Sequence, residues 1–488
     1  MKKRILSLCL CVALITGCFP VTGSAASNGA YTFIGGERPL VVVAGMDFTG
    51  LRMDVGTENE RPAIEPITAK GIIKTLFAAG AAAIKSKSFD AVVDKGIDYF
   101  RSIFGNLACD NTGTSIYNVG SHEYPNALST HADLILGGHN ESGIAKRAVE
   151  LYGGENVYFV LYDWRKSPLE VADKIAAAVD DAIATTGYST VNLVCASMGG
   201  VMTVGYLTKY GYEKLNKCVF VSSTFHGAQV VTDLFQGKIE VDSDALYNFV
   251  DGNLGKNTAV SGVFKVLKFV GVFRGLSAIA TPLIDRYQQT VYDEFLKDWF
   301  GYILPMWALV QPEDYEACLD FMFDGKEQES AAFIENTKEL QAMMANRDAL
   351  LQEAVENGVE IAVLTTYNLP LIPIYSGAVL NGDGTIETKY MSGGANVANY
   401  GKTLGERIIN SGSEYVSSDG VIDASTCAFP ESTWFIKDGI HVGCSHGSEQ
   451  SDFLFWILGF DGQATVKSHP SYPRFMQSDS AQNLTPLS

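Results

Sequence analysis

Short runs of apolar residues alternate with longer amphipathic stretches along most of the chain. The apolar runs occupy residues 38–47, 156–162, 191–196, 217–222, 359–365 and 433–438, and the amphipathic stretches include residues 168–186, 199–210 and 448–458. Continuous runs rich in β-branched residues are typical of strands covered on both faces. Alternation of such strands with helices over short links favours parallel pairing. The pattern therefore predicts an α/β fold with a mostly parallel central sheet and helices on both faces.

The alternation stops between residues 229 and 355, where no strand-like run occurs. An insertion of this length between two strands predicts a helical cap or lid. Within it, residues 263–281 are apolar on almost every side, and Lys265, Lys268 and Arg274 are the only charges. Two interpretations stay open. The stretch is either a helix packed inside the cap or a surface that meets lipid, since apolar faces edged by cations suit an interface.

The run at 191–196 ends at Ser197, and a helical stretch begins at Gly199. A strand, a sharp turn and a helix with a serine at the apex form the layout of a nucleophile elbow, where only small residues fit two positions either side of the serine, here Cys195 and Gly199. The turn would place the Met198 N–H at the start of a helix, where it can stabilise a developing oxyanion. The alternative is an ordinary strand-to-helix turn with an uninvolved serine.

A serine nucleophile needs a histidine base, and the histidine needs a carboxylate that orients it. In an elbow fold the acid and then the histidine follow the serine along the chain. Asp383 lies on a glycine-flanked loop after the strand at 359–365, and His441 follows the last predicted strand. His446, next to the final helix, is the alternative base. Taken singly, Asp383 could be a turn cap and His441 a structural side chain.

The loop after the first predicted strand is the expected source of a second oxyanion donor. Gly45 allows the backbone to turn there, and Met46 follows it. The backbone N–H groups of Met46 and Met198 are therefore the predicted oxyanion hole.

Four short motifs spread over residues 38–460 support this interpretation together. They are Leu40–Gly45, Tyr162-Asp163-Trp164-Arg165, Ala196-Ser197-Met198-Gly199-Gly200 and Gly382-Asp383-Gly384-Thr385-Ile386. In these motifs the chain resembles the α/β-hydrolases of the lipase and lecithin:cholesterol acyltransferase type, in a bacterial secreted form. The resemblance implies an α/β-hydrolase fold in which Ser197 is the nucleophile, Asp383 the acid and His441 the base.

The sequence departs from the family pattern at two positions. Cys195 stands where the elbow usually has Gly or Ala, and Ala44 stands where a proline often precedes the glycine of the oxyanion loop. Neither change is expected to abolish the chemistry. Trp164 and Arg165 are interpreted as structural residues near the site.

The chain of 488 residues carries a formal net charge of −19, which argues against a nucleic-acid partner because phosphate binding needs a basic surface. Lys2-Lys3-Arg4 precede an apolar run at 5–15 that is too short for a comfortable membrane span. Ser24-Ala25-Ala26 then offers a signal-peptide cleavage region, whereas Ile15-Thr16-Gly17-Cys18 resembles a lipoprotein box that would leave Cys18 lipidated. Either route predicts an extracytoplasmic protein.

Histidines and cysteines give no metal motif. His122, His131 and His139 lie in one loop-like region, but their spacing fits no known ligand set, so no metal or other cofactor is expected. Of the nine cysteines, three lie in the leader, and Cys427 and Cys444, which flank a predicted strand, are a candidate disulfide.

The chain is thus predicted to consist of a signal peptide (1–26), a first part of an α/β-hydrolase core (27–228), a helical cap (229–355), a second part of the core (356–462) and a polar tail without regular structure (463–488). The expected function is that of a secreted serine acyl hydrolase, a lipase or esterase acting on apolar acyl esters, or an acyltransferase if an alcohol resolves the acyl-enzyme. Thioester or peptide substrates stay open, because substrate choice lies in the cap. The alternative is a catalytically inactive surface protein of the same fold that binds an apolar ligand or partner.

Overall fold

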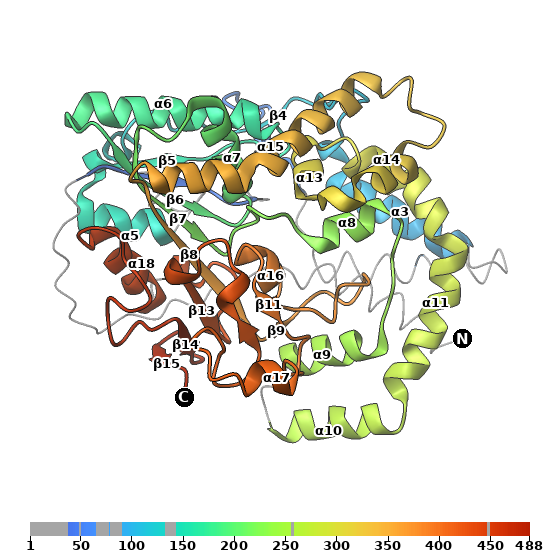
Figure 1. Cartoon of the computed structure of the whole chain (residues 1–488). Coiled ribbons are helices and arrows are strands. Elements are labelled where there is room, and N and C mark those ends of the chain that lie inside the picture. Colours follow the sequence, from blue (N-terminus) through green and yellow to red (C-terminus); the bar gives the residue numbers. More distant parts are fainter. Residues whose placement is uncertain are drawn as a thin grey trace.

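The central sheet of the computed structural model has eight strands in the order β15-β14-β13-β8-β7-β6-β1-β5 (Figure 1). The strands are β1 (Leu40–Val43), β5 (Val157–Val160), β6 (Val191–Ala196), β7 (Leu215–Val221), β8 (Glu360–Tyr367), β13 (Thr433–Lys437), β14 (Phe475–Ser478) and β15 (Leu484–Pro486). All neighbours pair in parallel except β14 and β15. The structure describes residues 38–47, 50–64, 78, 90–131, 143–254, 258–446 and 449–488.

Helices cover both faces of this sheet, as the apolar runs predict. The helices are α5 (Gly143–Tyr152), α6 (Pro168–Thr186), α7 (Gly199–Tyr210), α15 (Ala331–Glu356) and α18 (Glu449–Gly459). In β1, Val41 and Val43 belong to the apolar cluster that includes α6, α7 and α15, whereas Leu40 and Val42 belong to the cluster that includes α5 and α18. Because successive strand residues point to opposite faces, a fully apolar strand is what a sheet between two helical layers requires.

Local signals set the ends of the helix after β5. Ser167 accepts a hydrogen bond from the Leu169 N–H, Pro168 opens α6, and Gly187 ends it in the left-handed conformation at φ +78°. A serine cap, a proline in the first turn and a glycine after the last turn are the features that delimit helices in sequence. The observed bounds of α6 and α7 are those that the pattern predicts.

The insertion between β7 and β8 is helical. It contains α8 (Gln229–Phe235), α9 (Ser243–Leu254), α10 (Thr258–Phe269), α11 (Val272–Val291), a π-helical turn (Tyr292–Leu296), α12 (Lys297–Phe300), α13 (Leu304–Leu309), α14 (Tyr315–Phe323) and α15. Within the described part of residues 229–355, no named strand interrupts these helices. Figure 1 shows α8–α14 to one side of the sheet, while α15 returns across it.

The apolar stretch at 263–281 forms parts of two helices that meet at Gly271, whose φ of +79° ends α10 and redirects the chain. One side packs in a small cluster around Leu246 and Phe273. The opposite side is exposed, and Phe269 at the turn is 91% exposed. The packed side fits the first interpretation, and contact of the exposed side with lipid stays a prediction.

Smaller elements surround the core. The strands are β2 (Leu51–Met53), β3 (Arg61–Pro62), β4 (Val119–Ser121), β9 (Leu369–Pro370), β10 (Asn381–Gly382), β11 (Asn396–Val397) and β12 (Ile422–Asp423), and the helices are α3 (Asp90–Phe104), α16 (Thr388–Met391) and α17 (Glu406–Ile409). The predicted leader at 1–26 with Cys18, and His139, lie outside the described residues. None of the helices in the described part of the chain has the length and apolar character that crossing a bilayer requires.

Two expectations for the second half of the chain are wrong. The segment after residue 463 is not an irregular tail, because β14 pairs with β13 and β15 pairs with β14 at the edge of the central sheet. Cys427 and Cys444 form no disulfide. Each thiol is buried in a different apolar cluster, so the two packing environments separate them.

Candidate active site

Ser197 occupies the sharp turn between β6 and α7 that the motif predicts. Its φ is +51°, a left-handed conformation that a serine adopts only where the surrounding structure enforces it. The backbone of this turn is closely packed: a Cβ on Gly199 would lie 2.6 Å from the Ala44 carbonyl oxygen, and a Cβ on Gly45 would lie 2.9 Å from the Ser197 Cβ. Glycine at 45 and 199 is therefore a steric requirement of the elbow, whereas the larger Cys195 is accommodated inside the sheet with no exposure.

Asp383 lies in a tight turn after β10. Its Oδ1 accepts hydrogen bonds from the N–H groups of Thr385 and Ile386, each at 2.8 Å, and Gly384 provides a φ of +93°. The side chain is fully buried. The turn therefore uses one carboxylate oxygen to hold its own shape and leaves Oδ2 for another partner. Oδ1 of Asp383 therefore caps the turn, and Oδ2 of the same carboxylate is available for the role of the acid.

His441 lies in the loop after β13 and contacts both residues. Its Nδ1 is 2.5 Å from Asp383 Oδ2, and its Nε2 is 3.0 Å from Ser197 Oγ. The imidazole is partly exposed, at 24%. Three side chains that are distant in sequence thus meet at the carboxyl ends of β6, β8 and β13, in the arrangement of nucleophile, base and orienting acid. His446 ends a short 3₁₀ helix (Gly443–His446), and its side chain lies outside the described part of the structure.

The two predicted oxyanion donors flank the elbow. Met46 follows β1 and Gly45, and Met198 immediately precedes α7 in helical conformation. Among the described residues, neither backbone N–H has a hydrogen-bond partner. An oxyanion hole requires two such donors, and the backbone at Gly45, next to Met46, packs against Ser197.

The Tyr-Asp-Trp-Arg motif supports the loops around the site. The Tyr162 hydroxyl donates a 2.7 Å hydrogen bond to the Ala44 carbonyl, which fixes the loop that carries Met46. Arg165, 2% exposed, is paired with Asp163 at 2.7 Å and donates to the backbone carbonyls of Leu107 and Val119. These contacts are structural.

Sequence reasoning missed a buried carboxyl next to the acid turn. Glu387 precedes α16; its Oε1 accepts a 2.6 Å hydrogen bond from the Tyr375 hydroxyl, and its Oε2 accepts the Gln229 N–H at 3.3 Å. Burial, with a smaller contribution from the charge of Asp383, raises the pKa of Glu387 to about 7. The group joins the acid turn to the first cap helix. A single glutamate between Ile386 and Thr388 carries no sequence signal, so only the fold reveals this role.

Sequence reasoning also missed Ser222 and Thr224, in the loop after β7. The Thr224 N–H donates to the Ser197 carbonyl at 3.0 Å, and the Ser222 hydroxyl accepts the N–H of Val442, the residue after His441, at 3.1 Å. Serines and threonines after a strand are common, and the pattern of residues does not distinguish these two.

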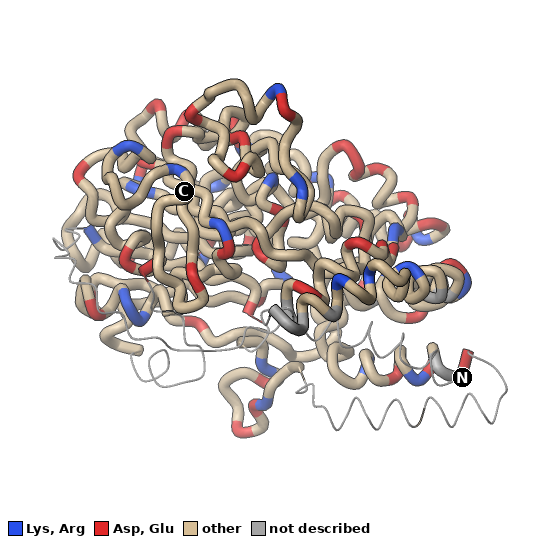
Figure 2. The backbone as a smooth tube through the Cα atoms, turned by 90° about the horizontal axis from the view of Figure 1, so that it is seen from below, with Lys and Arg blue, Asp and Glu red and all other residues tan. Residues whose placement is uncertain are grey.

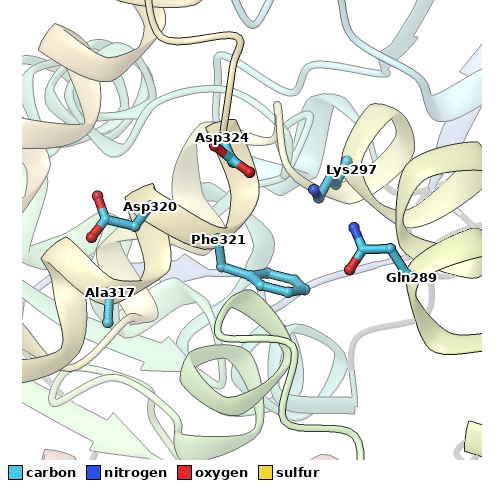
Figure 3. Close-up of a pocket in the computed structure, with 6 residues that line it drawn as sticks. All are labelled: Gln289, Lys297, Ala317, Asp320, Phe321 and Asp324. Carbon is cyan, nitrogen blue, oxygen red and sulfur yellow. The ribbon is translucent and has the colours of Figure 1, made fainter. Parts of the chain in front are cut away.

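Two of the hollows in the surface lie away from these residues. One, of about 360 Å³, is on the outside of the cap and is lined by Gln289, Lys297, Ala317, Asp320, Phe321 and Asp324 (Figure 3). Lys297 there is paired with Asp293 at 3.0 Å. The other, of about 700 Å³, lies between α6, α7 and α15. Neither is lined by Ser197, Asp383 or His441.

Two of the three histidines considered as metal ligands, His122 and His131, have other contacts. His122 Nε2 is 2.8 Å from Glu60 Oε1, and the ring of His131 packs edge-on against Tyr124. Within the described ranges, no three His, Cys, Asp or Glu side chains are grouped as metal ligands. Hydrogen bonds, chiefly from the Gly56 N–H, lower the pKa of Glu60 to about 2.

The strand order, with β1 between β5 and β6, and the elbow after β6 define an α/β-hydrolase fold. No protein-family model and no curated protein matches the sequence. Among solved structures, the chain is similar to the crystal structure of the Tle4–Tli4 complex, at 14% identity over 67% of this chain and 75% of that one, with a TM-score of 0.25. It is also similar to the esterase EaEST from Exiguobacterium antarcticum, at 13% identity over 50% and 71% of the two chains, with a TM-score of 0.19. Both similarities are weak, and the fold assignment rests on the strand order and the elbow.

Proposed function

We propose that the protein is a serine hydrolase that cleaves carboxylic esters through an acyl-enzyme. The observation that carries the proposal is the imidazole of His441, which lies between the Ser197 hydroxyl at 3.0 Å and the Asp383 carboxylate at 2.5 Å. A serine hydroxyl is a weak nucleophile at neutral pH, and a hydrogen-bonded histidine is the group that activates it.

Each residue has a defined role in the proposed reaction. Ser197 Oγ attacks the ester carbonyl while His441 Nε2 takes its proton, and the negative charge develops on the carbonyl oxygen beside the Met46 and Met198 N–H groups. His441 then gives the proton to the leaving alcohol. A water molecule, activated by the same imidazole, attacks the acyl group and frees Ser197. An alcohol in place of water would make the enzyme an acyltransferase.

Burial makes Asp383 effective in this scheme. Its carboxylate is fully buried and accepts hydrogen bonds through both oxygens, two of them from backbone N–H groups. A charge held in a low-dielectric environment interacts strongly with a cation beside it. The carboxylate therefore fixes the proton of the neutral imidazole on Nδ1 and stabilises the imidazolium that forms when His441 takes the serine proton.

A serine-reactive fluorophosphonate probe tests the nucleophile directly. The wild-type protein is expected to be labelled at Ser197, and Ser197→Ala is expected to show no labelling, because the probe needs an activated hydroxyl. Heat-denatured protein is the background control. Equal labelling of the wild type and Ser197→Ala would refute the assignment. Ligand binding that survives Ser197→Ala, with no turnover of nitrophenyl esters by the wild type, would favour the inactive surface protein instead.

The substrates are proposed to be lipids or other esters with long acyl chains, as in the lipase and lecithin:cholesterol acyltransferase family that the motifs resemble. The turn between α10 and α11 supports this, because Val266, Phe269 and Val270 are 60%, 91% and 63% exposed. Acidic and basic residues are distributed over the rest of the molecule (Figure 2). By contrast, residues 258–284 contain three cations and no acid in a chain with a net charge of −19, and one of the three, Lys268, is paired with Asp244 at 2.9 Å. An apolar tip edged by cations suits an anionic lipid surface. Location outside the cytoplasm, by a cleaved signal peptide or a lipid on Cys18, is part of the same proposal.

Vesicles of anionic phospholipid test the tip. Phe269→Ser is expected to weaken co-sedimentation with the vesicles about tenfold. The substitution removes the aromatic ring that would be buried in the lipid when the protein is bound. Ile116→Ser is the matched control, since Ile116 is 58% exposed but lies outside the cap. Equal binding of Phe269→Ser and the wild type would contradict the proposed interface and leave the ester chemistry untouched.

A further inference from the structure

Strained backbone is concentrated at the carboxyl edge of the central sheet. Among the described residues, seven other than glycine have a positive φ, and five of them follow the strands that carry the site. The five are Ser197 after β6, Ser222 after β7, Asn368 after β8, and Asp438 and Val442 after β13. Residues in this conformation persist only where the surrounding contacts hold them, and they gather at functional sites.

Val442 is the most unusual of the five. It is β-branched, its φ is +49°, and it directly follows His441. A β-branched side chain is rare in the left-handed region because its Cβ substituents crowd the backbone. The conformation turns the chain immediately after the imidazole, so the direction of His441 depends on whatever holds Val442 in place.

Within the loop, the Val442 carbonyl accepts hydrogen bonds from the Ser445 N–H at 2.9 Å and the Ser445 hydroxyl at 2.8 Å, and its N–H is bound by a side chain from the loop after β7. The Val442 N–H donates to the Ser222 hydroxyl at 3.1 Å. Ser222 is 1% exposed, has a φ of +43°, and is held in turn by its own N–H, which donates to the Leu364 carbonyl of β8 at 2.9 Å. The hydroxyl is thus anchored to the sheet and acts as a fixed acceptor for the histidine loop.

The same segment also holds the nucleophile. The Ser197 N–H donates to the Val221 carbonyl at 3.0 Å, and the Thr224 N–H donates to the Ser197 carbonyl at 3.0 Å. Val221 and Thr224 therefore bind the backbone of Ser197, and Ser222, which lies between them, binds the backbone next to His441. This segment sets the distance between the two groups that exchange the proton.

We propose that Ser222 is a positioning residue for the proton transfer between Ser197 and His441, an inference that rests on the proposed ester hydrolysis. Ser222 touches neither substrate nor reacting atoms. Its hydroxyl holds the strained backbone at Val442, which keeps His441 Nε2 within hydrogen-bonding distance of Ser197 Oγ. Loss of the hydroxyl releases the histidine loop while the elbow and the acid turn keep their own hydrogen bonds.

Two substitutions separate the hydroxyl from the backbone strain. Ser222→Gly removes the hydroxyl and suits a φ of +43°, whereas Ser222→Ala removes the hydroxyl and keeps a Cβ in the strained conformation. Both are expected to lower kcat about tenfold with an unchanged KM, the effect of losing one well-placed hydrogen bond. Ser222→Gly should also unfold at a higher temperature than Ser222→Ala. Ser223→Ala is the matched control: its hydroxyl is buried without a hydrogen-bond partner among the described residues, so kcat should not change.

A positioning role predicts that the effect of Ser222→Gly on activity depends on the presence of His441, whereas a purely structural role does not. Adding Ser222→Gly to His441→Ala should leave the residual activity as it is, because there is no imidazole left to position. The inference would be overturned if Ser222→Gly kept the wild-type kcat, including the case in which only the less stable Ser222→Ala lost activity. It would also be overturned if Ser222→Gly lowered the residual activity of His441→Ala by the same factor as it lowers the activity of the wild type. Full activity in Ser197→Ala and His441→Ala would instead overturn the proposed function, so the two failures are distinct.

Discussion

Replacing His441 with alanine is expected to lower kcat for ester hydrolysis by a factor on the order of 10⁶, which is the size of effect that loss of the base has in a serine hydrolase. Without the imidazole 3.0 Å from Ser197 Oγ, no group takes the hydroxyl proton as the bond to the carbonyl forms. The residual rate would come from substrate binding and the oxyanion donors. Hydrolysis of a nitrophenyl ester at saturating concentration measures the change.

Combination with Ser197→Ala makes the test stricter. Because the serine and the histidine act as one unit, the double variant should be no less active than either single variant. His446→Ala is the matched control, since it removes the other histidine of the same loop and is expected to keep the wild-type kcat. A large loss in His446→Ala together with an active His441→Ala would mean that the base has been assigned to the wrong residue.

Replacing Asp383 with asparagine is expected to lower kcat by a factor on the order of 10⁴ without unfolding the acid turn. Asparagine keeps an oxygen for the Thr385 and Ile386 N–H groups, so the turn retains its internal hydrogen bonds. The amide would, however, donate to His441 Nδ1 in place of the carboxylate. That contact places the ring proton on Nε2, and the nitrogen next to Ser197 can then no longer accept a proton.

Steady-state kinetics together with thermal unfolding separate this effect from misfolding. The unfolding midpoint of Asp383→Asn should stay close to that of the wild type while kcat falls. Asp383→Ala, which also removes the acceptor of the turn, should lower both quantities. An Asp383→Asn enzyme within tenfold of the wild-type kcat would show that the carboxylate does not control the histidine tautomer.

The core of the fold could be predicted because its sequence signals are local. The largely apolar strand β6 and the capped helix α6 each determine their structure within a few residues. The placement of Asp383 and His441 at one sheet edge follows from the order of strands, because the carboxyl ends of parallel strands meet on the same side. The sequence left His446 as an alternative base; the structure brings His441 to Ser197.

Other features depend on contacts between distant segments and could not be predicted. The polar segment that forms β14 and β15 becomes regular only because β13 offers an edge for pairing. Cys427 and Cys444 look like partners along the chain but are buried in separate clusters. Ser222 is an ordinary serine in the sequence, and its contact with Val442 links residues 220 positions apart.

The crowding around Gly45 limits how the acyl site can be redesigned. A Cβ at this position would lie 2.9 Å from the Ser197 Cβ and 3.2 Å from the Ala196 carbonyl oxygen. Mutant libraries aimed at a new substrate preference therefore gain nothing from varying Gly45. Under the proposed function, the cap outside α8 is the better place for diversity, because the Gln229 N–H at the start of α8 binds Glu387 beside the acid turn.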